Sequence, residues 1–357
     1  MRITNSMITD NSVWNINKNM ERLNDAQQKY TTQSKIQLPS DDPIVASRAV
    51  KYRSYVANIE QYQKNVNGAV SWEKVTDGAM DGLGNVIVRL KELVTKGSSS
   101  GTLTNSELQD IKAEVNELQQ QAVDYLNTSY AGRYVFAGYD TDKPPYEIES
   151  TAVGNRIKFK GQYLSVGGAM AGTTADSDIT SFCSAAYTNS KIYNSTAAAQ
   201  DIQYNVGFGT SVPVNVEGQN VTGAGLDNLF DTFSKILIGL DGGTSYKTAT
   251  VDSNPTPGSV HVTSTSFKLT DTLDELAANN NTILTARADL GARMNYTNMA
   301  KTRIDSDKAT YTELMSNNED TDLAESYTNV TTAQTVYNAS LSVSSKVMGK
   351  SLVDYLR

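Results

Sequence analysis

The residues that most often carry out chemistry are scarce in this chain, which has one histidine and one cysteine among 357 residues. His261 lies between Val260 and Val262 in a stretch that alternates like a β-strand, and it has no partner residues with which to bind a metal. We therefore expect a solvent-facing strand residue. Cys183 has no arguable histidine and asparagine partners for nucleophilic catalysis and cannot form a disulfide within the chain, so we expect a small packed residue.

Motifs for binding nucleotides or calcium are incomplete. Gly207-x-Gly209 and Gly223-x-Gly225 lack the last glycine of a dinucleotide loop and are interpreted as turns. Three acidic pairs lack the glycine and the later glutamate of a calcium loop and are expected on the solvated surface: Asp176/Asp178, Asp305/Asp307 and Asp320/Asp322. The sequence thus predicts no catalytic residue, no cofactor and no metal site, and we expect a protein that is not an enzyme.

The charge balance excludes two classes of partner. With 31 Lys and Arg against 39 Asp and Glu, the formal net charge is −8 and no basic cluster is present, which argues against binding nucleic acid or an anionic membrane. The longest apolar stretches, such as 236–240, are far shorter than a membrane span, and residues 1–17 lack the pattern of a cleaved signal. We expect no membrane insertion.

The distribution of proline and glycine divides the chain. The seven prolines leave 44–143 and 258–357 without a helix breaker, and 15 of the 24 glycines fall within 138–258. Within 156–160, 202–208 and 212–216, apolar and polar residues alternate as in half-buried strands, and only a patch from Leu226 to Leu240 has helical spacing. We expect helical ends and a β-rich middle.

In the N-terminal part, apolar residues recur at helical spacing. A first stripe ends before Pro39-Ser40-Asp41-Asp42-Pro43, where Ser40 to Asp42 can cap a new helix that has Pro43 in its first turn. The new helix is predicted from about 43 to 97, with an interruption of the stripe near Glu73. Thr104 and Glu107 form a capping box for an antiparallel return. The stripe of the first helix consists of Val13, Ile16, Met20, Leu23, Gln27 and Tyr30.

The C-terminal part repeats this pattern. Spacings of three and four run from Leu269 to Met315, and a last helix has apolar residues on two sides, which requires two packing partners. Its main stripe consists of Leu323, Tyr327, Val330, Gln334, Tyr337, Leu341, Ser344 and Met348, and its second stripe of Val336, Val343 and Val347. The predicted fold class is mainly α, with long antiparallel rods, a coiled-coil bundle made by both termini, and an inserted β-rich domain.

Four segments carry recognisable motifs: 38–43 with Ala46, Arg48 and Ala49; 132–138 with 141–146; 287–295; and 319–325 together with 351–357. These segments resemble the flagellin superfamily, and the last favours its hook–filament junction members over flagellin itself. Gln37-Leu38 departs from the basic or polar pair that many relatives have before the proline. Residues 147–265 carry no resemblance.

The resemblance implies a subunit that is exported largely unfolded and polymerises in the extracellular flagellum between a first junction protein and flagellin. It implies three parts: a terminal helical domain of the inner tube (1–42 with 315–357), a helical rod domain with a short β-hairpin (43–146 with 266–314), and a variable outer domain (147–265). It also implies an export chaperone that binds the C-terminal helix, Leu323 to Leu356.

The terminal stripes have two interpretations, either an intramolecular coiled-coil core or surface reserved for other copies of the chain. Their two-sided character favours the second, with terminal segments that order on assembly. The expected assembly interface consists of Val13, Ile16, Met20, Leu23, Tyr30, Leu323, Tyr327, Val330, Tyr337, Leu341, Met348 and Leu352, and the inter-domain joint of Pro39, Ser40, Asp41, Asp42 and Pro43. The alternatives are a flagellin that builds filaments, or an adhesive or glycan-acting β domain carried on the rods.

Overall fold

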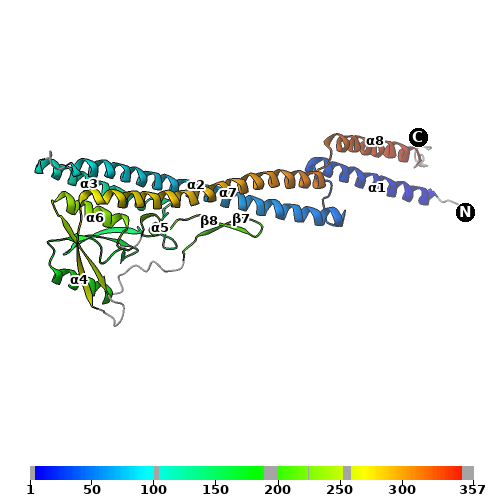
Figure 1. Cartoon of the computed structure of the whole chain (residues 1–357). Helices are drawn as coiled ribbons and strands as arrows, with labels where there is room; N and C mark the ends of the chain where they lie inside the picture. The colour runs from blue at the N-terminus through cyan, green and yellow to red at the C-terminus, as the bar shows by residue number, and fades with distance from the viewer. Residues whose placement is uncertain (1–4, 100–103, 189–198, 224, 252–258, 348–357) are drawn as a thin grey trace. The chain divides into compact units, whose positions relative to one another are not determined.

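A computed structural model describes residues 5–99, 104–188, 199–223, 225–251 and 259–347 (Figure 1). The chain forms two compact units, residues 1–61 with 303–357 and residues 62–302. Helices α2 (Pro43–Ser98) and α7 (Thr272–Glu319) each contribute to both units. The predicted helix over 43–97 is confirmed almost to the residue, because a cap with a proline in the first turn marks its start.

The first unit contains helices α1 (Asn5–Thr32) and α8 (Leu323–Val347), which lie side by side (Figure 1). They are antiparallel, since Ser34 and Asp320 form an antiparallel bridge where α1 ends and α8 begins. In the same unit the start of α2 contacts the end of α7. Arg53 Nε donates to Glu319 Oε2 at 3.0 Å, and the Tyr55 and Tyr311 rings lie 5.3 Å apart.

The second unit packs α2 and α7 with helix α3 (Asn105–Leu126). The Thr104–Glu107 capping box is confirmed, and Arg89 Nε donates to Glu114 at 2.7 Å across the antiparallel α2–α3 pair. Glu73 does not interrupt α2. It is fully buried and accepts a hydrogen bond from Thr297 Oγ1 of α7 at 2.9 Å, and burial raises its pKa.

Short strands form another part of this unit. A hairpin joins β1 (Ser129–Tyr130) and β2 (Arg133–Tyr134), and a second joins β7 (Gln203–Gly207) and β8 (Thr210–Pro213). Two three-stranded antiparallel sheets have the orders β3-β4-β5 and β10-β9-β6. Their strands are β3 (Tyr146–Thr151), β4 (Gly154–Phe159), β5 (Gln162–Tyr163), β6 (Met170–Ala171), β9 (Ser245–Val251) and β10 (Val260–Ser266).

Three helices of the middle segment accompany these strands: α4 (Asp176–Thr188), α5 (Gly218–Thr222) and α6 (Leu229–Leu240). Phe230 and Phe233 of α6 share one apolar core with α2, α3 and α7, whereas a smaller core lies between α4 and the β10-β9-β6 sheet. The helical ends and the β-rich middle are confirmed. A single turn of 3₁₀ helix (Leu269–Asp271) precedes α7.

Four details differ from the sequence prediction. Helix α4 was not predicted, because its serines, threonines and alanines give little helical periodicity. Strand β8 ends at Pro213, so 214–216 are not strand. Leu226 precedes α6 and is partly exposed. Arg156 was expected on a polar face, yet it is 3% exposed and lies 3.8 Å from Asp231 of α6.

Candidate assembly interface

The α1–α8 pair holds the predicted interface residues, and it covers only some of them. Ile16 and Leu23 of α1 and Val330 and Tyr337 of α8 are half-buried, as expected for residues on the facing sides of two paired helices. In α8 the small residues Ser326 and Ser344 are buried on the same side, which allows the helices to approach closely. These residues form the seam of the pair.

The other predicted residues stay largely in solvent. Tyr327 is 58% exposed although its ring lies 6.0 Å from that of Tyr30. The remaining members of this exposed set are Val13, Met20, Tyr30, Leu323 and Leu341. Met348 and Leu352 lie outside the described residues. A large apolar side chain in water lowers solubility, so a group of them on one helix pair is typical of a surface that another chain covers.

Further exposed apolar residues lie outside the predicted interface set. Val336 and Val343, members of the predicted second stripe of α8, are 45% and 59% exposed. Met7 and Trp14 of α1 are also exposed, and Trp14 reaches 62%. Trp14 was missed because it does not fit the three- and four-residue spacing. Its size and its place seven residues after Met7, which put both on one side of the helix, were the signals that pointed to it.

The predicted inter-domain joint contains two adjacent carboxylates that accept backbone hydrogen bonds. Asp41 Oδ2 accepts the backbone N–H groups of Gln37 at 3.0 Å and Leu38 at 2.9 Å. These bonds, that of Leu38 first, lower the pKa of Asp41, since they favour its charged form. Asp42 Oδ1 accepts from the N–H groups of Ile44 and Val45 and thereby caps α2.

The remaining joint residues frame this cap. Pro39 and Ser40 are exposed, and Pro43 begins α2. The predicted position of the cap, immediately before Pro43, is therefore confirmed. The role of the five residues as a joint between domains stays a prediction.

Between the end of α7 and the start of α8, an aspartate again caps a helix. Asp322 Oδ1 accepts from the N–H groups of Ala324 at 2.7 Å and Glu325 at 3.3 Å, which caps α8. The backbone of 33–35 bonds to the chain at 319–321 through Lys35 N to Glu319 O and Thr321 N to Gln33 O. Asp42 thus caps the start of α2 and Asp322 caps the start of α8. The backbone segments 33–35 and 319–321, which lie next to these caps in sequence, are hydrogen-bonded to each other.

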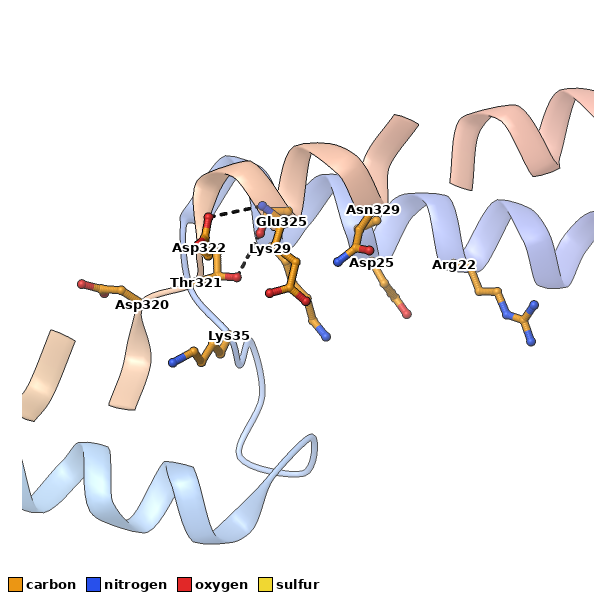
Figure 2. Close-up of a pocket in the computed structure, with 11 residues that line it drawn as sticks. Arg22, Asp25, Lys29, Lys35, Asp320, Thr321, Asp322, Glu325 and Asn329 are labelled. Atoms are coloured by element: carbon orange, nitrogen blue, oxygen red, sulfur yellow. Dashed lines mark hydrogen bonds between the residues drawn. The ribbon is translucent and has the colours of Figure 1, made fainter. Parts of the chain in front are cut away.

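A hollow of about 710 Å³ opens beside these two linking segments, as Figure 2 shows. Arg22, Asp25 and Lys29 of α1 line one side, and Glu325 and Asn329 of α8 line the other. Lys35 and Asp320 also line it, and Lys35 Nζ donates to Asn317 O at 2.7 Å. Charges of both signs meet there, so the hollow favours neither anions nor cations.

The histidine and the cysteine lie in surroundings typical of a surface strand and of an apolar core. His261 is exposed on β10 with Ser259 Oγ 3.2 Å from its ring, as predicted, and Cys183 is buried in the small core. Asp176 pairs with Lys247 at 2.9 Å, so its charge is balanced at the surface.

Within the described residues, no group of three or more potential metal ligands occurs. None of the helices in that part of the chain is long and apolar enough to cross a membrane.

Comparison with known sequences identifies the family. The bacterial flagellin N-terminal helical region matches residues 3–141, and the bacterial flagellin C-terminal helical region matches residues 273–356. The two matches together cover more than half of the chain. The protein belongs to the flagellin superfamily. The predicted family is therefore confirmed, and it is a family of structural proteins of the flagellum.

Within the flagellin superfamily, the chain is similar to flagellar hook-associated protein 3 of Escherichia coli K12, with 27% identity over 170 residues. That match covers 47% of this chain, and the chain spans about half the length of the curated relative. A flagellin of Escherichia coli O127:H6 is 30% identical over 110 residues, or 31% of this chain and 19% of that flagellin.

One solved structure shows the same fold. A putative flagellar hook-associated protein from Vibrio parahaemolyticus aligns with a TM-score of 0.54 at 14% identity, over 78% of this chain and all of that one. The long paired helices with a central segment of strands are thus a fold that this solved structure shares.

Proposed function

We propose that this protein is a structural subunit of the junction between the hook and the filament of the bacterial flagellum. It acts by contact between copies and with neighbouring subunits rather than by catalysis. The observation that carries this proposal is the exposure of Met20, Tyr327 and Leu341 on a helix pair whose seam is already filled. A lone chain leaves this apolar surface in water, and further copies would cover it.

The parts of the chain have different tasks in this proposal. The terminal helical domain, 1–42 with 315–357, builds the inner tube, and the rod domain, 43–146 with 266–314, surrounds it. The segment 147–265 is the variable outer part. The capped joint at Pro39 to Pro43 connects the first two.

The partners follow from the same proposal. The subunit forms a ring of copies, sits between a first junction protein and flagellin, and is secreted through the flagellar channel in a largely unfolded state. An export chaperone holds the C-terminal helix until then. The terminal segments order fully when copies meet, because assembly supplies the apolar partners that a lone chain lacks.

Sedimentation of the purified full chain over a range of concentrations tests the self-association. The variant Met20→Ser/Tyr327→Ser/Leu341→Ser should stay monomeric at concentrations at which the parent assembles. Val88→Ser is the matched control, since Val88 is 52% exposed on α2 and belongs to the other compact unit, residues 62–302. A triple variant that assembles like the parent would contradict the proposed interface.

A second candidate function is that of flagellin, which the 30% identity over 110 residues favours. The two functions differ in the length of the polymer. A flagellin extends into long filaments from purified protein, whereas a junction subunit stops at a short ring. Electron microscopy of the assembled chain distinguishes them, whereas cells that lack the gene should keep hooks but lose filaments under either function.

A further inference from the structure

The middle of α8 carries no charge. Between Ser326 and Ser345 there is no Asp, Glu, Lys or Arg, whereas α1 carries six charged residues. Hydroxyl groups of α8 donate to carbonyls of their own helix, among them Thr328 to Ala324 at 2.9 Å and Thr335 to Thr331 at 2.8 Å. Because these donors already have partners, covering them with another chain costs little desolvation energy.

Two apolar surfaces flank the seam of the α1–α8 pair. We define surface A as Val13, Met20, Tyr327 and Leu341, and surface B as Val336 and Val343, all at least 41% exposed. Successive side chains of an α-helix are rotated by about 100° about its axis. Tyr327 and Val336, nine positions apart, therefore point to opposite sides of α8. The seven-residue spacing places surface B in line with Asn329, which lines the hollow of Figure 2, and surface A lies across the seam from it.

The two surfaces match in position along the pair. Tyr30 lies beside Tyr327, which fixes the register of the antiparallel helices. Met20 precedes Tyr30 by ten residues and Val336 follows Tyr327 by nine, so both lie at about the same level. Val13 and Val343 each lie seven residues further on, and they are again level with each other. Most residues beside the two surfaces are uncharged: Asn17, Asn24, Gln334 and Asn338 beside A, and Asn11, Asn15, Thr332 and Ala339 beside B. The charged neighbours come from α1 alone, with Asp10 beside A and Lys18 and Arg22 beside B.

We propose that surface B of one copy packs on surface A of a second copy in the same orientation, with Val336 against Met20 and Val343 against Val13. This inference rests on the proposed function, because it needs copies of the chain to meet. Pairing A with A gives a dimer and leaves surface B in water. Pairing B with A uses two different surfaces, so each added copy again offers a free A or B surface. Such a series covers both surfaces on every copy once it closes into a ring, which happens when the rotation from one copy to the next divides a full turn.

Disulfide cross-linking of the full chain tests this pairing. The background is Cys183→Ala, which removes the native thiol, and its fold is checked by circular dichroism. The double variant Met20→Cys/Val336→Cys should form a ladder of linked oligomers under mild oxidation. The two cysteines lie on opposite sides of one pair, so they cannot close within a single chain. A mixture of the two single variants should stop at a linked dimer, and each single variant alone should give none.

Glu21→Cys/Val336→Cys is the matched control, since Glu21 is next to Met20 in sequence but points to another side of α1. A ladder from the Met20 variant and none from the control supports the pairing. A linked dimer from either single variant alone would show contact between identical surfaces and overturn it. An assembling protein without the ladder overturns the pairing alone, whereas a parent chain that never assembles overturns the proposed function as well.

Discussion

The aromatic rings of Tyr30 and Tyr327 lie 6.0 Å apart at 52° to each other, and they join the end of α1 to the start of α8. A tilted pair of this kind contributes about 0.5–1 kcal/mol beyond its buried area. We expect a double-mutant cycle with Tyr30→Leu and Tyr327→Leu, measured by urea unfolding of the monomer, to give a coupling energy of that size. Additive effects of the two changes would show that the rings do not interact in solution.

The cap of α2 provides a second prediction. Asp42→Ala leaves the N–H groups of Ile44 and Val45 without their carboxylate acceptor, which should cost about 1 kcal/mol of stability. Ser40→Ala is the control, because Ser40 is exposed and its hydroxyl makes no hydrogen bond within the described residues. Thermal unfolding should show a lower midpoint for the first variant only. Equal midpoints would argue against the cap.

Two glycines of α2 should respond to alanine with opposite signs. A Cβ on Gly82 would lie 2.4 Å from Cε1 of Tyr125 in α3, so Gly82→Ala forces the helices apart and should destabilise the protein by about 1–3 kcal/mol. A Cβ on Gly78 meets no atom within 4 Å. Gly78→Ala should therefore stabilise the protein by roughly 0.5–1 kcal/mol, since alanine favours the helix. Chemical denaturation of both variants measures the two signs.

The buried carboxylate of Asp231 predicts a pH dependence. Burial raises its pKa to about 7, against the opposing charge of Arg156. The unfolded chain releases this proton near pH 4, so between about pH 4 and 7 the folded state holds a proton that the unfolded state has lost. The free energy of unfolding contributed by this group therefore falls as the pH rises through that window.

Comparison of the parent with Asp231→Asn isolates this effect. The stability of the parent relative to the variant should increase as the pH is lowered from 7 towards 4, measured by urea unfolding at several pH values. Glu73, whose pKa is also raised by burial, contributes a slope of the same sign in both proteins and cancels in the difference. A difference that does not change with pH would mean that Asp231 is ionised throughout.

The helical part of the fold could be predicted because its signals are local. Pro43 and the preceding aspartates mark the start of α2, and the spacing of Leu83, Ile87 and Leu90, all fully buried, shows which side faces the core. The exposed side of the terminal helices was predictable for the same reason. An apolar stripe on each of two sides is visible in the α8 sequence before any partner is known.

The remaining features depend on residues distant in sequence. Arg156 was placed on a polar face because alternation alone treats every arginine as exposed, and Asp231, which accounts for its burial, lies 75 positions away. Trp14 was missed because it lies outside the three- and four-residue stripe of α1, and its seven-residue spacing from Met7 involves only these two residues. Matching surface A to surface B along the helix pair also required the register of α1 against α8. The contact between Tyr30 and Tyr327 sets this register, and it cannot be read from the sequence.

The uncharged middle of α8 has a consequence for the environment in which the chain works. Counterions weaken attraction only between charged groups, and salts excluded from apolar surface strengthen its burial. A contact made through Ser326 to Ser345 therefore holds in concentrated brine at least as well as in dilute buffer. A cell that moves between fresh and saline water could keep such a contact without changing a residue of this helix.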